Sequence, residues 1–99
     1  MDTPEITHHP DGNRGSFTID RDGKRLASMI YSRAGDLIII NHTEVDPALR
    51  GTGAGARLVG AAVDWARADH LRIMTLCPFA KSVFDKKPEY HDVLVRTRS

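Results

Sequence analysis

The stretch 45-VDPALRGTGAGARLVGAAVDWA-66 decides the fold. Its glycines at 51, 53 and 55 come directly before a run in which Leu58, Val59, Ala62 and Val63 follow helical spacing. This pattern predicts a helix over residues 55–69 that buries one apolar face. The sequence therefore predicts a glycine-rich loop that leads into a helix, near the middle of the 99 residues.

The segments before this loop are predicted to be strands. Residues 16–20 and 25–33 alternate apolar and polar side chains, and residues 37–45 begin as a continuous apolar run. Asp22-Gly23 is typical of a tight hairpin turn, and Gly35 marks a second turn, so these strands form an antiparallel meander. Residues 5–9 are expected to form a short edge strand.

The segments after the loop helix predict a change of connection. Residues 71–76 form a second buried strand, which must run parallel to 37–45 because a helix connects the two. A short helix over 80–87 and a last turn, PEYHDVL at 88–94, follow. The expected fold is α+β: an antiparallel meander, then a parallel β-α-β unit, with two to three helices in a single domain over 1–99.

Composition indicates an ordinary globular domain. The chain carries 14 Lys and Arg against 13 Asp and Glu, which gives no general reason to expect nucleic acid or membrane partners. Its one cysteine excludes an internal disulfide, and no signal peptide or transmembrane run is visible, so a cytoplasmic location is expected. His8 and His9 lack a second ligand cluster; a solvated turn is expected there, and no metal site.

The glycine loop is suited to an anion. Backbone N–H groups at a helix start lack intrahelical partners and carry partial positive charge, and glycines let a ligand approach them closely. Phosphate or pyrophosphate is the expected ligand, with a simple packing turn as the alternative. Dinucleotide and P-loop motifs fit poorly, because the next strand ends without an acid and Gly55 is followed by Ala56-Arg57 rather than by Lys-Ser/Thr.

A better match is Arg50-x-x-Gly53-x-Gly55, which resembles the pyrophosphate loop of the GNAT superfamily of N-acetyltransferases. HTEV at 42–45, CPFAKSVF at 77–84 and PEY at 88–90 resemble, more particularly, a short GNAT-like branch of small single-domain proteins. This resemblance covers about residues 16–95 and implies acetyl-CoA as cosubstrate. It implies that the loop amides hold the pyrophosphate, over Arg50, Gly51, Thr52, Gly53, Ala54, Gly55 and Ala56.

The resemblance also implies roles for residues beside the loop. The backbone at Glu44 and Val45 would pair with the pantetheine arm where the two parallel strands splay apart. Lys81, Lys86 or Lys87 would reach the 3′-phosphate, although a solvated helix face is the ordinary alternative for each lysine. Phe84 is placed next to the cofactor, at the position where related enzymes often carry a proton-donating tyrosine.

Acetyl transfer to an amine needs a base for the amine and a proton for the leaving thiolate. Since Phe84 has no proton to give, Cys77, just before a helix, is the alternative group, either as nucleophile or as acid; an inert buried thiol is the other possibility. His42 and Glu44 are candidates for the base. Alternation predicts that both share a strand face with Ile38 and Ile40, and that Asn41 and Thr43 point the other way.

The expected function is acetyl-CoA-dependent transfer of an acetyl group to a primary amine of a small molecule or a protein. The alternative is a non-catalytic acyl-CoA-binding or regulatory module, which the phenylalanine at position 84 favours. The sequence does not indicate the acceptor or the oligomeric state.

Overall fold

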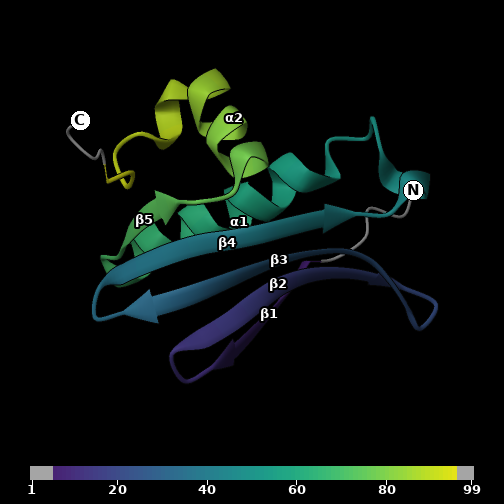
Figure 1. Cartoon of the computed structure of the whole chain (residues 1–99), viewed down its shortest axis with the longest axis horizontal. Coiled ribbons are helices and arrows are strands. Elements are labelled where there is room, and N and C mark those ends of the chain that lie inside the picture. Colours follow the sequence, from purple (N-terminus) through teal and green to yellow (C-terminus); the bar gives the residue numbers. More distant parts are fainter. Residues whose placement is uncertain (1–5, 96–99) are drawn as a thin grey trace.

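The chain folds into a five-stranded sheet with helices packed against it, and the computed structural model describes residues 6–95. The elements in chain order are β1 (Ile6–Asp11), β2 (Arg14–Arg21), β3 (Lys24–Ala34), β4 (Leu37–Val45), the 3₁₀ turn η1 (Pro47–Leu49), α1 (Ala54–Asp69), β5 (Arg72–Thr75), α2 (Pro78–Lys86) and the 3₁₀ turn η2 (Pro88–Tyr90). The sheet order is β1-β2-β3-β4-β5, antiparallel except for the parallel β4–β5 pair (Figure 1). The predicted α+β architecture is confirmed.

Three hairpins build the antiparallel part of the sheet. Asp22 and Gly23 both adopt positive φ, 53° and 77°, as the favoured two-residue hairpin turn requires. Gly35 has φ 62° in the β3–β4 turn. The β1–β2 hairpin turns at Gly12, so β1 extends to Asp11, further than the predicted edge strand; residue 5 lies outside the described residues.

The N-terminal histidines are part of the packed sheet, so the expected solvated turn is wrong. The His8 ring stacks on Phe17, with ring centroids 4.2 Å apart, and its Nε2 lies 2.6 Å from the Tyr31 hydroxyl. Burial lowers the pKa of His8 and raises that of Tyr31. Strand pairing, which brings His8 opposite Phe17, overrides the polar character of the local sequence.

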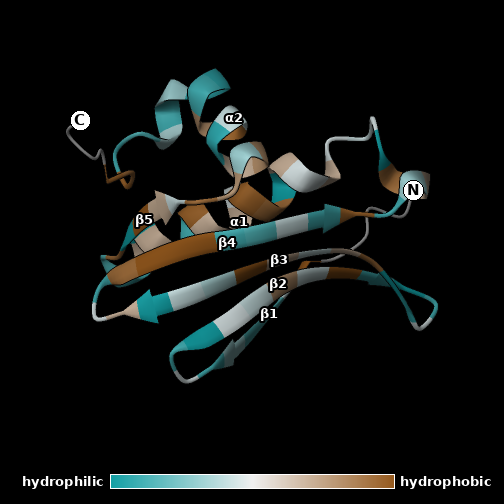
Figure 2. Cartoon of the chain, viewed as in Figure 1, coloured by the Kyte–Doolittle hydropathy of each residue, from teal (hydrophilic) through white to brown (hydrophobic). Residues whose placement is uncertain are grey.

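The core lies between α1 and one face of the sheet. Five residues of α1 that share its inner face are at most 1% exposed: Leu58, Val59, Ala62, Val63 and Ala66. Trp65 of the same helix meets the ring of Tyr31 on β3 at 5.3 Å, which identifies the sheet face that α1 covers. In Figure 2, β4 is brown over its first half, which supplies Ile38 and Ile40 to this core, and teal to white over its second half.

A β-bulge in β4 reverses the faces predicted for its second half. Tyr31 pairs with Ile40, but the next pair along is Ile30 with His42, so Asn41 is an inserted residue. An inserted residue moves every later side chain to the opposite face. His42 and Glu44 do share a face, as predicted, but it is not that of Ile38 and Ile40.

The residue that the bulge brings to the α1-covered face is Thr43. It pairs with Met29, which lies two residues from Tyr31 on β3 and therefore on the same face. The Asn41 side chain stabilises the bulge, because its Nδ2 donates to the Ser32 hydroxyl at 2.7 Å. The prediction that Thr43 points away from the core face is wrong for this reason.

The parallel pairing of β4 with β5 is short. It runs from Leu37–Arg72 to Ile40–Thr75, and the backbone N–H of Leu76 donates to the Ile40 carbonyl at 2.9 Å where it ends. Beyond this point β4 continues to Val45, whereas the segment after β5 enters α2 at Pro78. The two strands therefore diverge, as the resemblance implies.

The C-terminal segment is held against α1 and β5. The Arg67 guanidinium forms two hydrogen bonds with the Asp92 carboxylate, which lower the pKa of Asp92. The backbone of Ile73 on β5 bonds to Val93 and Val95, and Tyr90 packs its hydroxyl against Gly60, where a Cβ would lie 2.9 Å away.

No helix in the described residues is long and apolar enough to cross a membrane.

Gly15 gives a test of the packing around Tyr31. A Cβ at this position would lie 2.2 Å from the Tyr31 hydroxyl and 2.9 Å from the His9 carbonyl, and Tyr31 is only 1% exposed. We therefore expect Gly15→Ala to lower the free energy of unfolding by about 1–3 kcal/mol, through overpacking. Urea denaturation measures it, with the neighbouring Ser16→Ala as control at less than about 0.5 kcal/mol. Equal midpoints for the two variants would contradict the packing described.

Candidate active site

The glycine loop is shaped by its own backbone. Asp46 accepts a hydrogen bond from the Ala48 N–H at 2.9 Å and so starts η1. Gly51 and Gly53 then adopt φ of 81° and 82°, in the region that glycine enters without strain. The Thr52 hydroxyl donates to the Leu49 carbonyl, so this side chain is used within the loop.

At the start of α1, the loop leaves main-chain amides that have no hydrogen-bond partner within the helix. Gly53 is the N-cap and has no side chain to cap the helix, and the first intrahelical bond is from the Arg57 N–H to the Gly53 carbonyl at 3.0 Å. The amides of Ala54, Gly55 and Ala56 precede that bond, and the first turn carries no acidic residue. The helix dipole adds partial positive charge at the same place, which suits an anion.

A cavity of about 300 Å³ opens beside these amides. Most of the residues that the resemblance assigned to the cofactor line this cavity: Val45, Arg50, Gly51, Gly53, Ala54, Gly55, Ala56, Lys86 and Lys87. Its opposite wall is α2, which contributes Phe79, Ser82 and Val83. We call this space the loop cavity.

Phe79 explains why the third glycine is needed. A Cβ on Gly55 would lie 2.4 Å from the Phe79 ring, so this glycine permits close approach of α2 rather than a positive φ. Phe79 nevertheless stays 42% exposed at the cavity wall. The sequence analysis quoted this phenylalanine within a motif but did not assign it to the site.

Two predicted cofactor residues lie elsewhere. Lys81 forms an ion pair with Asp85 at 3.1 Å, one helical turn along α2, and both line a different cavity, of about 590 Å³. Phe84 lines that same cavity and is 1% exposed, with its ring centroid 6.0 Å from that of Tyr90. The structure thus groups Lys86 and Lys87 with the loop and separates Lys81 and Phe84 from it.

A further cavity, of about 410 Å³, lies where the start of β3 pairs with the end of β4. It shares Val45 and Arg50 with the loop cavity and is also lined by Thr43, Glu44 and Asp46. We call it the strand-end cavity. Because its walls carry both acidic and basic side chains, it can hold a polar molecule next to whatever occupies the loop cavity.

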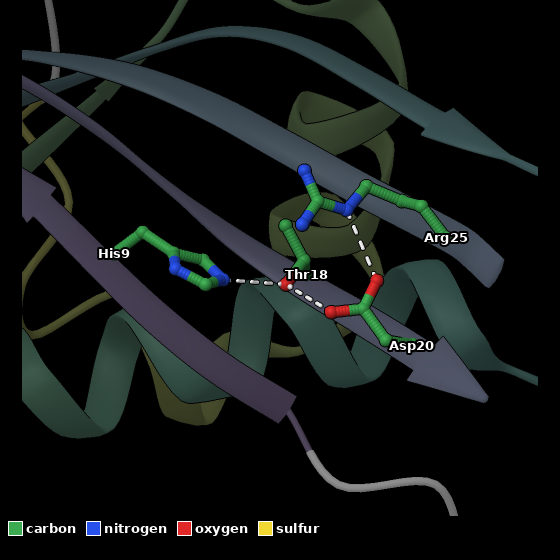
Figure 3. Close-up of polar contacts among 4 residues, drawn as sticks. All are labelled: His9, Thr18, Asp20 and Arg25. Atoms are coloured by element: carbon green, nitrogen blue, oxygen red, sulfur yellow. Dashed lines mark hydrogen bonds and ion pairs between the residues drawn. The ribbon is translucent and has the colours of Figure 1, made fainter. Parts of the chain in front are cut away.

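A hydrogen-bond network fixes one wall of the strand-end cavity (Figure 3). Arg25, which lines the cavity, donates through Nε to Asp20 at 3.0 Å, and this bond lowers the pKa of Asp20. The Thr18 hydroxyl donates to the same carboxylate at 3.4 Å and lies 2.9 Å from His9 Nε2. Thr18 is fully buried, so the network is anchored to the sheet.

Cys77 lies where β4 and β5 diverge, at the N-cap of α2. It is 6% exposed, and its Sγ lies 3.5 Å from the Thr43 hydroxyl across the gap. Burial by itself would raise the pKa of the thiol, but the dipoles of the Ala80 amide, the Thr43 hydroxyl and the amides of Phe79 and Thr43 together lower it. The helix start predicted beside Cys77 is confirmed. The contact with Thr43 was not predicted, because the bulge that brings Thr43 to this side of β4 was not predicted.

His42 and Glu44 form a pair on the other face of β4. His42 Nε2 lies 3.3 Å from Glu44 Oε2, and both side chains are more than half exposed. Glu44 also lines the strand-end cavity. The structure does not bring this pair against Cys77: the bulge places Thr43, which contacts Cys77, and the His42–Glu44 pair on opposite faces of the strand.

A sequence profile of the GCN5-related N-acetyl-transferase family matches residues 16–93. The chain belongs to this family. The match runs from within β2 through the glycine loop and both helices to just past η2, so of the site residues described in this section only His9 lies outside it. None of the curated proteins compared with the chain matches it.

Solved structures agree with the GCN5-related fold. A GCN5-like candidate N-acetyltransferase from Staphylococcus aureus is 34% identical, with a TM-score of 0.74 over 99% of this chain and 94% of that one. The Escherichia coli ribosomal-protein-S18-alanine N-acetyltransferase has a TM-score of 0.66 at 17% identity, and the match spans 78% of this chain but 53% of that one. An aminoglycoside N-acetyltransferase, AAC(6′)-Iy, solved with CoA, has a TM-score of 0.57 at 15% identity over 77% of this chain and 67% of that one. At such identities the last two show the fold alone.

The ionisation of Cys77 can be measured directly because the chain has a single cysteine. We expect thiolate absorbance to titrate with a lower midpoint in the folded protein than in urea, because donors around Sγ lower the pKa. By linkage, this group stabilises the fold above the ordinary thiol pKa, and the contribution is lost as pH falls through the folded pKa. A folded midpoint at or above the unfolded one would contradict the donor arrangement; Cys77→Ala provides the absorbance blank.

Proposed function

We propose that this protein is an acetyl-CoA-dependent N-acetyltransferase whose acceptor is a primary amine. Family membership establishes acetyl transfer in general, and the observation that carries the finer proposal is the loop cavity. Its free helix-start amides, with Arg50, Lys86 and Lys87 on the rim, suit a pyrophosphate with further phosphate nearby. The CoA bound to a protein of the same fold supports this assignment.

In this proposal, the pantetheine arm leaves the loop cavity along Val45 and enters the gap between β4 and β5. Val45 lines both cavities. The pairing of β4 with β5 ends at Ile40–Thr75, so the main chain of β4 beyond Ile40 is available on that side to an extended ligand. The thioester then lies near Cys77 and Thr43. The acceptor occupies the strand-end cavity, on the side of Glu44.

The reaction requires three events at this place. The neutral amine attacks the thioester carbonyl carbon, the carbon–sulfur bond breaks, and the CoA sulfur leaves with the bonding pair and takes up a proton. Glu44, which lines the strand-end cavity, or His42, which is paired with Glu44, accepts through water the proton that the amine loses, because the pair lies on the face of β4 opposite Cys77. As a thiol, Cys77 donates a proton to the departing CoA sulfur. As a thiolate, Sγ first attacks the thioester carbonyl carbon and releases CoA, and the amine then attacks the acetyl-Cys77 thioester and releases the Cys77 thiolate.

Binding is the first test. We expect saturable calorimetric binding of acetyl-CoA and of CoA, and none of NADH or ATP at the same concentrations. Gly53→Ala should weaken CoA binding on the order of 10-fold, because a side chain strains φ 82° at the N-cap and displaces the loop amides. Gly35→Ala, which imposes the same kind of strain in a hairpin at φ 62°, is the matched control and should bind normally.

Loss of CoA binding in both variants would point to unfolding rather than to the loop. Absence of binding in the unaltered protein would refute the cofactor assignment altogether.

Catalysis by Cys77 is a separate test. We expect Cys77→Ala to lower kcat by on the order of 100-fold with little change in the KM for acetyl-CoA, because the thiol acts on the reacting centre and not on the phosphates. The assay follows CoA release with a panel of amines, and intact mass after rapid quenching shows whether Cys77 carries an acetyl group. Unchanged kcat would remove Cys77 from the mechanism.

One observation favours a second function, an acyl-CoA-binding module without catalysis. Phe84 stands where the resemblance implies a proton-donating tyrosine, and it is buried against Tyr90. Binding of CoA without transfer to any amine in the panel would support this function.

A further inference from the structure

We propose that Thr43 is the positioning residue for Cys77: its hydroxyl holds the sulfur at the mouth of the β4–β5 gap. The inference rests on the proposed function, because it assigns Cys77 to the transfer site. It concerns a residue that the sequence pattern pointed away from the core.

The first support is geometric. Thr43 Oγ1 lies 3.5 Å from Sγ although the two residues are 34 positions apart. This contact spans the gap just after the last β4–β5 pair, Ile40–Thr75, where backbone bonds no longer join the strands. With a neutral thiol, the sulfur donates to Oγ1; with a thiolate, the hydroxyl turns and donates to the sulfur.

The second support is the rest of the sulfur's surroundings. The amides of Phe79 and Ala80, in the first turn of α2, and the Thr43 amide lower the pKa of the thiol, but the Cys77 side chain forms no capping hydrogen bond with α2. Among the described residues, the Thr43 hydroxyl is therefore the side-chain partner of the sulfur. If the hydroxyl is removed, only main-chain dipoles remain to offset the burial of a charged sulfur.

The charged side chains on the elements around Cys77 have other partners and so do not take the place of the Thr43 hydroxyl. On β4, His42 and Glu44 pair with each other on the opposite face. On α2, Lys81 pairs with Asp85 and lines another cavity. No residue of β5 from Ile73 to Thr75 carries a charge.

The third support is that Thr43 is placed by a built feature. The bulge at Asn41 turns Thr43 onto the Cys77 side, and the Asn41–Ser32 hydrogen bond stabilises that bulge. A strand without the bulge would present Thr43 to the opposite face. Thr43 also lines the strand-end cavity, so it lies between the sulfur and the proposed acceptor.

The test compares Thr43→Val, which keeps the β-branched shape and loses the hydroxyl, with Thr43→Ser, which keeps the hydroxyl. We expect the thiolate midpoint of Cys77 to rise by about one pH unit in Thr43→Val and to stay near that of the unaltered protein in Thr43→Ser. Thr7→Val, the same change on the exposed edge strand β1, is the matched control and should leave the midpoint unchanged. Amide NMR spectra confirm that each variant is folded.

The transfer assay supplies the second readout. In Thr43→Val, kcat should fall on the order of 10-fold, with its pH profile moved in the same direction as the thiolate midpoint and CoA affinity retained; Thr43→Ser should restore both. An unmoved midpoint in Thr43→Val would overturn the proposal, as would a moved midpoint with unchanged kcat. Failure of CoA binding in the unaltered protein would instead refute the proposed function, so the two failures are distinguishable.

Discussion

The site depends on the early end of the pairing between β4 and β5. After Ile40–Thr75, no further pair joins the two strands, and the bulge at Asn41 redirects β4 at this same point. Had the strands stayed paired to Val45, backbone hydrogen bonds would occupy the space in which Thr43 and Cys77 now meet. A paired sheet has no unused main-chain groups in its interior, so divergence is the means by which a central strand offers its backbone to a ligand.

The glycines of the loop meet two different physical requirements. Gly51 and Gly53 are needed for their positive φ, which brings the chain from η1 into α1 within a few residues. Gly55 and Gly60 lie inside α1 and are needed for space, because Phe79 and the Tyr90 hydroxyl pack where their Cβ atoms would be. One glycine-rich segment thus shapes the anion-binding end of α1 and also lets α2 and the C-terminal segment close against the same helix.

Local patterns determined most of this fold, and so most of it could be predicted. The hairpin at Asp22-Gly23, the apolar stripe of α1 and the parallel return through β5 all follow from residues near one another in the chain. The faces of the second half of β4 could not be predicted in the same way. Asn41 is an unremarkable residue in an alternating strand, and the bulge becomes visible only from its pairing with β3.

One further error has the same origin in contacts between distant segments. His8 is polar by type and lies in a polar sequence, yet it stacks on Phe17 and contacts Trp65 once β1 joins the sheet. The separation of Lys81 from Lys86 and Lys87 is instead a local matter, since Asp85 lies four residues after Lys81 and pairs with it. Spacing alone, however, does not say which face of a short helix meets a ligand.

The arrangement around Cys77 shows how a small domain can keep a buried sulfur ionisable. A nearby cation would lower the thiol pKa, but a buried cation has its own desolvation cost, and a domain of 99 residues has little core in which to compensate it. The groups that lower the pKa of the thiol here are two main-chain amides of α2 and the amide and hydroxyl of one threonine, all neutral and already fixed by the fold. Such fixed dipoles stabilise a charge without reorganising when it forms. Three of the four belong to the backbone and persist through most substitutions, so the Thr43 hydroxyl is the one group that a change of side chain removes.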